Sequence, residues 1–214
     1  MRSYVAPQAV TYLDSLVPPR HPELVAMERY AQEHGFPIIG PLLGHLCYQL
    51  ARLVGARHVF ELGSGFGYST AWFARAVLEN GGGRVHHVVW DEAMSLDARK
   101  ALDRMGLSSV VEFHLGEAVQ VLAEQKGSFD VIFNDIDKRA YPESLPMIEP
   151  RLRPGGLLIV DNMLWSGRIF DEADQSPDTV GVRQLTRLLT TSPNWTTSVL
   201  PVRDGIILAS KRDA

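Results

Sequence analysis

The 214-residue sequence contains a single cysteine, Cys47, so no disulfide can form within the chain. Cys47 lies among apolar residues at helical spacing, which is typical of a small buried side chain. No apolar run approaches the ~18 residues that span a bilayer, and the N-terminus carries no apolar secretory region. Together these absences predict a cytoplasmic protein that does not enter a membrane.

The sequence also lacks an excess of basic residues, because 25 acidic residues outnumber 21 lysines and arginines and give a formal net charge of −4. This balance disfavours nonspecific nucleic-acid binding, which depends on positive charge that releases counterions from phosphates. A local basic patch stays possible. Repeats and low-complexity stretches are absent, and 45% of the residues are hydrophobic, which predicts an ordinary globular core.

Strand and helix patterns alternate along the sequence from residue 58. The expected strands cover 58–62, 84–90, 110–115, 129–135, 155–162, 195–202 and 205–210, and the expected helices cover 69–79, 93–105, 117–125, 141–152 and 178–191. This alternation is typical of an α/β fold with a doubly wound, mostly parallel seven-stranded sheet. The last two strands are expected to form an antiparallel hairpin across Arg203-Asp204-Gly205.

Three helices are expected before the first strand. A short helix precedes Pro18-Pro19, and apolar residues recur at helical spacing in 21–35 and in 41–55. We therefore predict one domain, residues 1–214, in which residues 1–57 add N-terminal helices to an α/β core of residues 58–214.

A glycine-rich turn, "ELGSGFGYS", follows the first expected strand. Ligands of such sheets bind beyond the carboxyl ends of the strands. The G-x-G-x-G spacing differs from the G-x-G-x-x-G of dinucleotide enzymes. Ser69 is expected to cap the next helix, whose free N–H groups suit a carboxylate, and Glu61 suits an ammonium group. The turn thus favours a ligand with an amino-acid moiety, although glycines that serve packing alone remain the alternative.

An oxygen-rich group of residues follows the fourth and fifth expected strands. It comprises Asp135, Asp137, Asp161 and Asn162. Carboxylates are costly to bury unless they are paired or bind a metal, and hard cations prefer such oxygen ligands. Lys138 comes three residues after Asp135, and beside a metal it suits a general base. The alternative is that these carboxylates are solvated helix caps and Lys138 is a surface residue.

Several segments together resemble the cation-dependent class I O-methyltransferases that use S-adenosylmethionine, the group of catechol and caffeoyl-coenzyme A O-methyltransferases and their bacterial relatives. The matching segments are "PIIGPLLGHLCYQLARL", "GARHVFELGSGFGYST", "FDVIFNDIDKRAY", "LRPGGLLIVDNMLWSGRI" and "LPVRDGIILA". The resemblance covers nearly the whole chain from about residue 22, and the pairing of "DxDK" with "DNxLWxG" is its most specific feature.

The resemblance implies a role for each matching residue. Asp135, Asp161 and Asn162 match ligands of a divalent metal, with Mg²⁺ expected first and Ca²⁺ or Mn²⁺ as alternatives. Lys138 matches the general base toward the acceptor hydroxyl. Trp165 and Ser166 match the loop that bounds the acceptor, a small molecule with vicinal oxygens such as a catechol. Implied contacts with S-adenosylmethionine are Ile39, Glu61, Gly63, Ser64, Gly67, Ser69, Ala118 and Asp137.

The sequence departs from the family pattern at three positions. The family usually carries an acid at the end of the second strand to hold the ribose hydroxyls, and the matching position here is Val89. Asp91, two residues later, is the proposed replacement, with a plain surface residue as the alternative. Asn134 and Ile136 stand where the family more often has an aliphatic residue and alanine, and neither change removes a ligand.

Other functions remain open at this point. Some bacterial relatives methylate hydroxylated uridine in transfer RNA, and a cluster of Arg52, Arg57, Arg168 and Arg183 at the site mouth would favour that acceptor. A dinucleotide-dependent oxidoreductase is disfavoured by the glycine spacing, and a non-catalytic cofactor-binding protein is disfavoured by the retained acids and lysine. The resemblance also implies a homodimer.

His86 and His87 are adjacent in an expected strand. Neighbouring strand residues point to opposite faces of a sheet, so these two side chains cannot serve one metal ion together. A structural role is expected for both.

Overall fold

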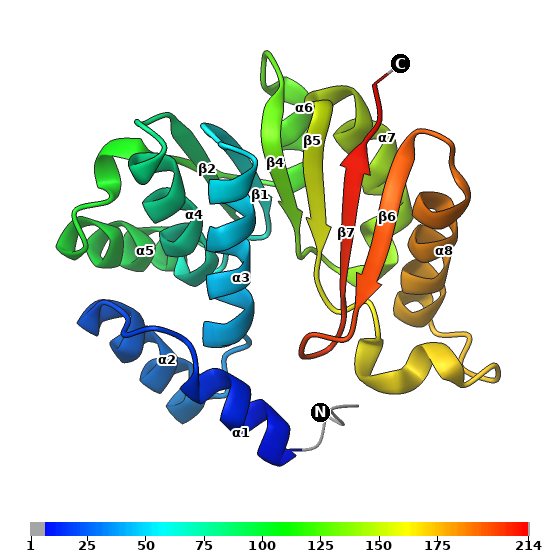
Figure 1. Ribbon diagram of the computed structural model, residues 1–214, viewed down its shortest axis with the longest axis horizontal. Helices are drawn as coiled ribbons and strands as arrows, with labels where there is room; N and C mark the ends of the chain where they lie inside the picture. The colour runs from blue at the N-terminus through cyan, green and yellow to red at the C-terminus, as the bar shows by residue number, and fades with distance from the viewer. Residues whose placement is uncertain (1–6, 214) are drawn as a thin grey trace.

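A seven-stranded sheet forms the centre of the molecule, in the order β3-β2-β1-β4-β5-β7-β6 (Figure 1). The structure is a computed structural model and describes residues 7–213. The strands are β1 (His58–Leu62), β2 (Arg84–Val89), β3 (Val111–Leu115), β4 (Phe129–Asn134), β5 (Leu152–Val160), β6 (Trp195–Leu200) and β7 (Ile206–Lys211). Strands β1 to β5 are parallel, and β7 pairs antiparallel with both β5 and β6. The predicted sheet and closing hairpin are confirmed.

Helices cover both faces of this sheet (Figure 1). They are α1 (Pro7–Ser15), α2 (Pro22–His34), α3 (Gly40–Leu53), α4 (Tyr68–Glu79), α5 (Glu92–Arg104), α6 (Ala118–Glu124), α7 (Tyr141–Arg151) and α8 (Pro177–Thr191), with 3₁₀ turns η1 (Ser108–Val110), η2 (Lys138–Ala140) and η3 (Trp165–Phe170). One face packs against α3, α4 and α5, and the other against α6, α7 and α8. Across residues 7–213, none of the helices is long and apolar enough to cross a membrane.

The first face of the sheet is tightly packed against α3 and α4. Cys47 is completely buried there, as its spacing predicted. A side-chain carbon built on Gly44 would lie 2.2 Å from Trp72 Nε1, so only glycine lets the two helices approach this closely. Trp72 and Phe73 are also buried, and burying each such ring contributes roughly 1.5–3 kcal/mol.

Most element boundaries differ from the sequence-based expectation by one or two residues, and two differences have a clear physical reason. Strand β5 begins at Leu152, three residues earlier than expected, because Leu152 pairs with Phe129 across a register irregularity in β4. Helix α4 begins at Tyr68 with Gly67 as its N-cap and no capping side chain. The expectation that Ser69 caps this helix is therefore wrong, and Ser69 lies within the first turn instead.

The strand order fixes where a ligand would bind. Strand β1 lies between β2 and β4. Strands β2 and β3 are added on one side of β1, and β4 and β5 on the other, so the strand order reverses at β1. In such sheets the carboxyl ends of the two strands at the reversal border a crevice. Glu61 is near the end of β1 and Asp135 follows β4, so the fold brings the two predicted parts of the site to one edge.

Candidate functional site

The carboxylate of Glu61 is completely buried at the end of β1. Thr70, in the first turn of α4, donates a hydrogen bond from Oγ1 to Glu61 Oε2 at 2.5 Å. The hydroxyls of Ser64 and Ser69 lie near this carboxylate and act to lower its pKa. The other oxygen, Oε1, has no hydrogen-bond partner among residues 7–213. A buried acceptor without a partner is costly, and an ammonium group of a ligand would satisfy it.

Burial raises the pKa of Glu61 from 4.5 to about 7, although the three hydroxyls oppose this shift and Asp135 adds to it. At neutral pH the carboxyl is therefore poised between its neutral and charged forms. A cation placed beside Oε1 would favour the charged form. The donor set around Glu61 thus fits the ammonium of an amino-acid moiety, which agrees with the sequence-based expectation.

His87 supports Thr70 from the neighbouring strand. Its Nδ1 lies 3.0 Å from Thr70 Oγ1, and burial lowers the pKa of His87 to about 3, so the ring is neutral. The Thr70 hydroxyl donates its hydrogen bond to Glu61. In the contact with His87 it therefore acts as the acceptor, and His87 Nδ1–H donates. His87, Thr70 and Glu61 form a buried chain of hydrogen bonds that fixes the orientation of the carboxylate.

Glycines of the turn after β1 are required by the protein's own packing. A side-chain carbon on Gly63 would lie 2.7 Å from the carbonyl oxygen of Asp135, and one on Gly67 would lie 2.8 Å from Ala98 Cβ. Both residues also have positive φ, 88° and 92°. The packing interpretation of these two glycines therefore holds whether or not they also contact a cofactor.

Two carboxylates lie together where β4 and β5 end. Lys138 Nζ is 2.6 Å from Asp135 Oδ1 and 3.2 Å from the carbonyl oxygen of Ile136. Asp161 is buried, and burial together with the nearby Asp135 raises its pKa to about 7. The pKa of Asp135 is also raised by burial, although Lys138 opposes this shift. Two carboxylates that disfavour each other's charge fit a cation placed between them.

Asn162 is held by Asp204, a buried residue that sequence analysis treated only as part of a turn. Asn162 Nδ2 donates to Asp204 Oδ2 at 3.3 Å, and the backbone N–H of Ser166 donates to Asp204 Oδ1 at 2.6 Å. Because the amide nitrogen is engaged, Asn162 Oδ1 is left as an oxygen ligand. In the sequence, the only indication of a role for Asp204 was its position as an acid between two expected strands. The residues that it binds are 38 and 42 positions earlier, so the sequence did not reveal them.

The segment after β5 has an unusual backbone. Asn162, Trp165 and Ser166 have φ angles of 58°, 46° and 51°, which residues other than glycine rarely adopt. The turn before β7 stabilises this conformation, since Leu164 N–H donates to Asp204 O at 2.7 Å and Met163 N–H donates to the carbonyl of the next residue in that turn at 2.8 Å. Backbone strain of this kind clusters at ligand sites.

Arg203 is a second residue that sequence analysis missed. Its guanidinium donates from Nη1 to the carbonyl of Ile38 at 2.7 Å, just before α3. Its positive charge also favours the ionised forms of Asp135 and Asp161 and so opposes the rise in both pKa values. Arg203 therefore links the N-terminal helices to the pair of carboxylates.

The remaining predicted cofactor residues lie at ends of elements along the same edge. Ile39 precedes α3 and is buried, and Ala118 is the first residue of α6 and is also buried. Asp91 caps α5, accepting from Met94 N–H at 3.0 Å, so one of its oxygens is already engaged. Val89 is only 8% exposed and offers no polar group. The structure gives Asp91 a helix-capping role and leaves its second oxygen for a ligand.

Trp165 is close to Lys138, whose Nζ lies 5.9 Å from the centre of its ring and 5.2 Å from that of Tyr141. The indole N–H of Trp165 is buried and has no hydrogen-bond partner in the part of the chain that the structure describes. Asp137 is exposed before η2, apart from this buried group. Asn134, the departure before Asp135, donates from Nδ2 to a serine of α7 at 3.0 Å and so anchors the end of β4.

The four arginines that would indicate a nucleic-acid acceptor do not gather at the site. Arg52 and Arg57 bind polar groups that follow α4, at the amino end of β1. Arg168 and Arg183 bind groups of residues 168–176, which follow β5. The arginines thus lie at opposite ends of the strands, and most of their donors are used within the chain.

Comparison with known proteins identifies the family. The profile of the O-methyltransferase family matches residues 26–212. A catechol O-methyltransferase from Niastella koreensis is 35% identical over 184 residues, which cover 83% of this chain and 82% of that protein. The chain belongs to the O-methyltransferase family, as its motifs indicated.

Solved structures agree with this assignment. An O-methyltransferase from Bacillus cereus in complex with SAH has a TM-score of 0.86 and 28% identity, with coverage of 96% of this chain and 97% of that one. TomG, an O-methyltransferase from Streptomyces achromogenes involved in tomaymycin synthesis and solved in complex with SAM, has a TM-score of 0.86 and 27% identity, with 96% of each chain covered. The α/β fold read from the sequence is therefore that of solved O-methyltransferases.

Proposed function

We propose that this O-methyltransferase uses S-adenosylmethionine and a divalent cation to methylate one of two vicinal oxygens on a small, catechol-like acceptor. The observation that carries the proposal is the position of Lys138, 2.6 Å from Asp135, beside the buried carboxyl of Asp161. A base, two acidic ligands and an amide oxygen at one edge of the sheet are the groups that metal-assisted methylation of a hydroxyl requires.

Glu61 and its hydroxyl partners are proposed to hold the amino-acid moiety of the cofactor. Oε1 of Glu61 would accept from the ammonium, and the free N–H groups at the start of α4 would suit the carboxylate. Ile39, Ala118, Ser64 and Asp137 would contribute further contacts. The bound cofactor supplies the methyl group as an electrophilic sulfonium.

Asp135, Asp161 and Asn162 are proposed to hold the cation, with Mg²⁺ as the first choice because all of these ligands are oxygens. A bound cation supplies a Lewis acid that orients the acceptor oxygens and lowers the pKa of a hydroxyl. Lys138 accepts the hydroxyl proton at Nζ. Lys138 Nζ now contacts Asp135 Oδ1, an oxygen that would instead hold the cation.

Trp165 and Ser166 are proposed to border the acceptor. The indole N–H of Trp165 is buried with no partner among the described residues, and it would donate to an oxygen of the acceptor. The name of the Niastella koreensis relative supports a catechol as the first acceptor to test. A hydroxylated uridine in transfer RNA is a weaker candidate, because the arginines that would favour it are used elsewhere. A homodimeric assembly and a cytoplasmic location stay predictions.

Calorimetric titration of S-adenosylmethionine and its demethylated product, with and without Mg²⁺, tests the proposal. It is followed by turnover on catechol compounds such as caffeate. We expect cofactor binding by the wild type and methylation that is abolished by a chelator and restored by Mg²⁺. Asp161→Ala is expected to bind cofactor but lose turnover, whereas Asp97→Ala, an exposed acid on α5, is expected to behave as wild type.

Each contrary outcome has a defined meaning. Normal turnover in Asp161→Ala, or in the presence of chelator, would overturn the role of the metal. Cofactor binding without turnover on any catechol would overturn the proposed acceptor and make hydroxylated transfer RNA the next substrate to test. Failure of both ligands to bind would overturn the cofactor assignment and make the glycine-rich turn a packing element only.

A further inference from the structure

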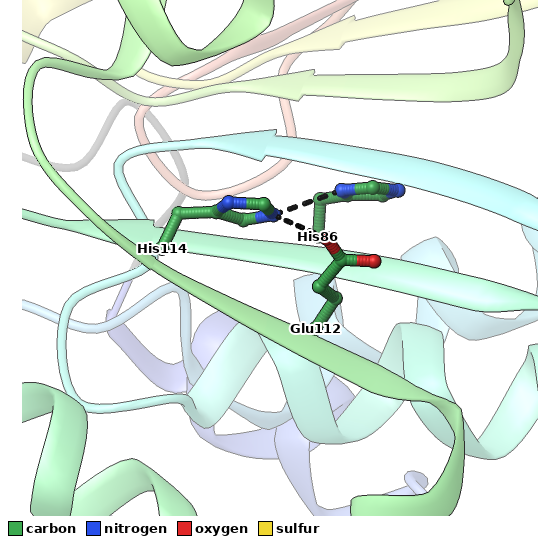
Figure 2. Close-up of side chains that lie close together, drawn as sticks. All are labelled: His86, Glu112 and His114. Carbon is green, nitrogen blue, oxygen red and sulfur yellow. Dashed lines mark hydrogen bonds and ion pairs between the residues drawn. The ribbon is translucent and has the colours of Figure 1, made fainter. Parts of the chain in front are cut away.

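A second group of ligating side chains lies on the edge strand β3 and on its neighbour β2, in residues that the proposed methyl transfer does not use. Figure 2 shows His86 on β2 facing Glu112 and His114 on β3. His86 pairs with Glu112 across the strands, and His114 is two residues further along β3, so all three side chains share one face. Sequence analysis expected a structural role for His86 but did not consider Glu112 and His114, which lie beside it in the structure.

Distances within this group are close to those of a metal site. His86 Nδ1 is 3.0 Å from His114 Nε2, and His114 Nε2 is 3.6 Å from Glu112 Oε1. One ligand atom from each residue lies within 4.8 Å of the other two. Two nitrogens bound to a tetrahedral zinc at ~2.0–2.1 Å are roughly 3.3 Å apart, so small side-chain rotations would accommodate an ion.

The two imidazoles face each other through one nitrogen of each ring. Burial lowers the pKa of His86 and that of His114, and the 3.0 Å between their ring nitrogens places one nitrogen of each ring toward the other. Their planes differ by only 10°, with centroids 5.2 Å apart, which fits an N–H···N hydrogen bond without metal. An ion would replace the proton that lies between His86 Nδ1 and His114 Nε2. That proton would move to the other nitrogen of the ring that carried it. Each ring then keeps one proton.

Packing holds His86 in place, whereas Glu112 is open to solvent. The ring of His86 stacks on Phe60 at 5.6 Å and meets the edge of Phe129 at 5.3 Å. The side chain of Glu112 is about half exposed, at 49%, so an ion can enter from solvent. Arg84 lies 3.9 Å from Glu112 Oε2, the oxygen that faces away from the histidines, and leaves Oε1 for the ion.

We propose that His86 Nδ1, His114 Nε2 and Glu112 Oε1 form a binding site for Zn²⁺ or a similar transition-metal ion, with water as the fourth ligand. Two imidazoles and one carboxylate are a ligand set that zinc accepts and that Mg²⁺ does not prefer. The bound ion would link the edge strand β3 to β2 and stabilise that edge. This inference does not depend on the proposed methyl transfer.

Zinc titration of metal-free protein by calorimetry tests the site, and it is best done in Asp161→Ala so that the carboxylates of the proposed active site do not compete. We expect one zinc ion per chain and a rise in melting temperature with zinc. His114→Gln, a half-buried position, is expected to weaken zinc binding by about tenfold or more. His34→Gln is the control, since His34 is an exposed histidine on α2, which packs on the other side of the sheet.

A second measurement avoids substitutions in the cluster. In ¹⁵N spectra of the histidine side chains, zinc is expected to shift His86 Nδ1 and His114 Nε2 and to leave His34 unchanged. Equal zinc affinity in His114→Gln and in its parent would overturn the proposal, as would spectra in which neither of these two nitrogens responds. If the substituted proteins fail to fold, the spectra of the unsubstituted chain decide alone.

Discussion

Lys138 Nζ lies 2.6 Å from Asp135 Oδ1, three residues earlier in the chain, and both side chains are largely withdrawn from water. The same i,i+3 spacing occurs on α5 between Asp97 and Lys100, at 3.3 Å, but there both side chains are 65% exposed. An exposed pair of this kind contributes little to stability. The two pairs differ in environment and not in spacing, which makes the second a natural control for the first.

Lys138→Ala is expected to lower kcat by roughly 10²–10⁴-fold, the usual contribution of a general base, and to leave the Kd of the cofactor unchanged. Lys138→Arg is not expected to restore activity, because a guanidinium does not release its proton. Steady-state kinetics on a catechol acceptor, with cofactor titration, checks both. Lys100→Ala is the control. A kcat of Lys138→Ala within a factor of a few of wild type would contradict the role of base.

Thermal stability of the cofactor-free and metal-free chain is expected to fall between about pH 5 and about pH 8. The pKa of the Glu61 carboxyl is about 7 in the folded chain, against an ordinary value of 4.5 for the unfolded chain. Between these two pH values the folded chain keeps a proton that the unfolded chain releases. The resulting stability is fully present below the lower value and is lost as the pH rises through about 7. The loss per group is about 1.4 kcal/mol per pH unit within that window.

Glu61→Gln is expected to reduce this pH dependence but not to remove it, because Asp161 has a raised pKa of about 7 for the same reason. Melting temperatures measured across the pH range in the wild type, in Glu61→Gln and in Asp161→Asn separate the two contributions. An unchanged slope in Glu61→Gln would mean that the carboxyl of Glu61 does not titrate in this range.

Asp204→Ala is expected to raise the Mg²⁺ concentration needed for half-maximal activity by about 10–100-fold, as loss of a residue that orients a ligand usually does. Asp204 holds the amide of Asn162 and the N–H of Ser166, so both lose their orientation together. Asp204→Asn keeps one acceptor oxygen and should have a smaller effect. Lower stability with an unchanged Mg²⁺ requirement would make Asp204 a purely structural residue.

Gly63→Ala is expected to destabilise the chain by roughly 3 kcal/mol or more, because the added carbon meets the Asp135 carbonyl at 2.7 Å in a backbone with φ of 88°. Gly55→Ala is the matched control, since φ is 63° and no atom of the described residues lies within 4 Å of the added carbon. It should cost only the conformational strain, roughly 1–2 kcal/mol. Chemical denaturation of both variants measures the difference, and equal values would refute the close approach.

The elements of the fold and the position of the site could be predicted from the sequence because the patterns that indicate them are local. The order of strands and helices follows from apolar periodicity over a few residues, and the sheet type follows from that order. The acids and the lysine were found because the carboxyl ends of parallel strands share one edge. Their assignment as metal ligands and base came from the resemblance and stays a prediction.

Other features depend on pairs that are far apart in the chain. Asp204 meets Asn162 across 42 residues, Arg203 reaches Ile38 across 165, and His86 meets His114 across 28. No local pattern encodes such contacts, because they depend on strand register and on how a turn docks against a loop. The sequence by itself determined the elements, their order and the edge that carries the site. Only the tertiary structure decided which side chains hold Glu61 and Asn162 in place, since it brings distant residues within hydrogen-bond distance.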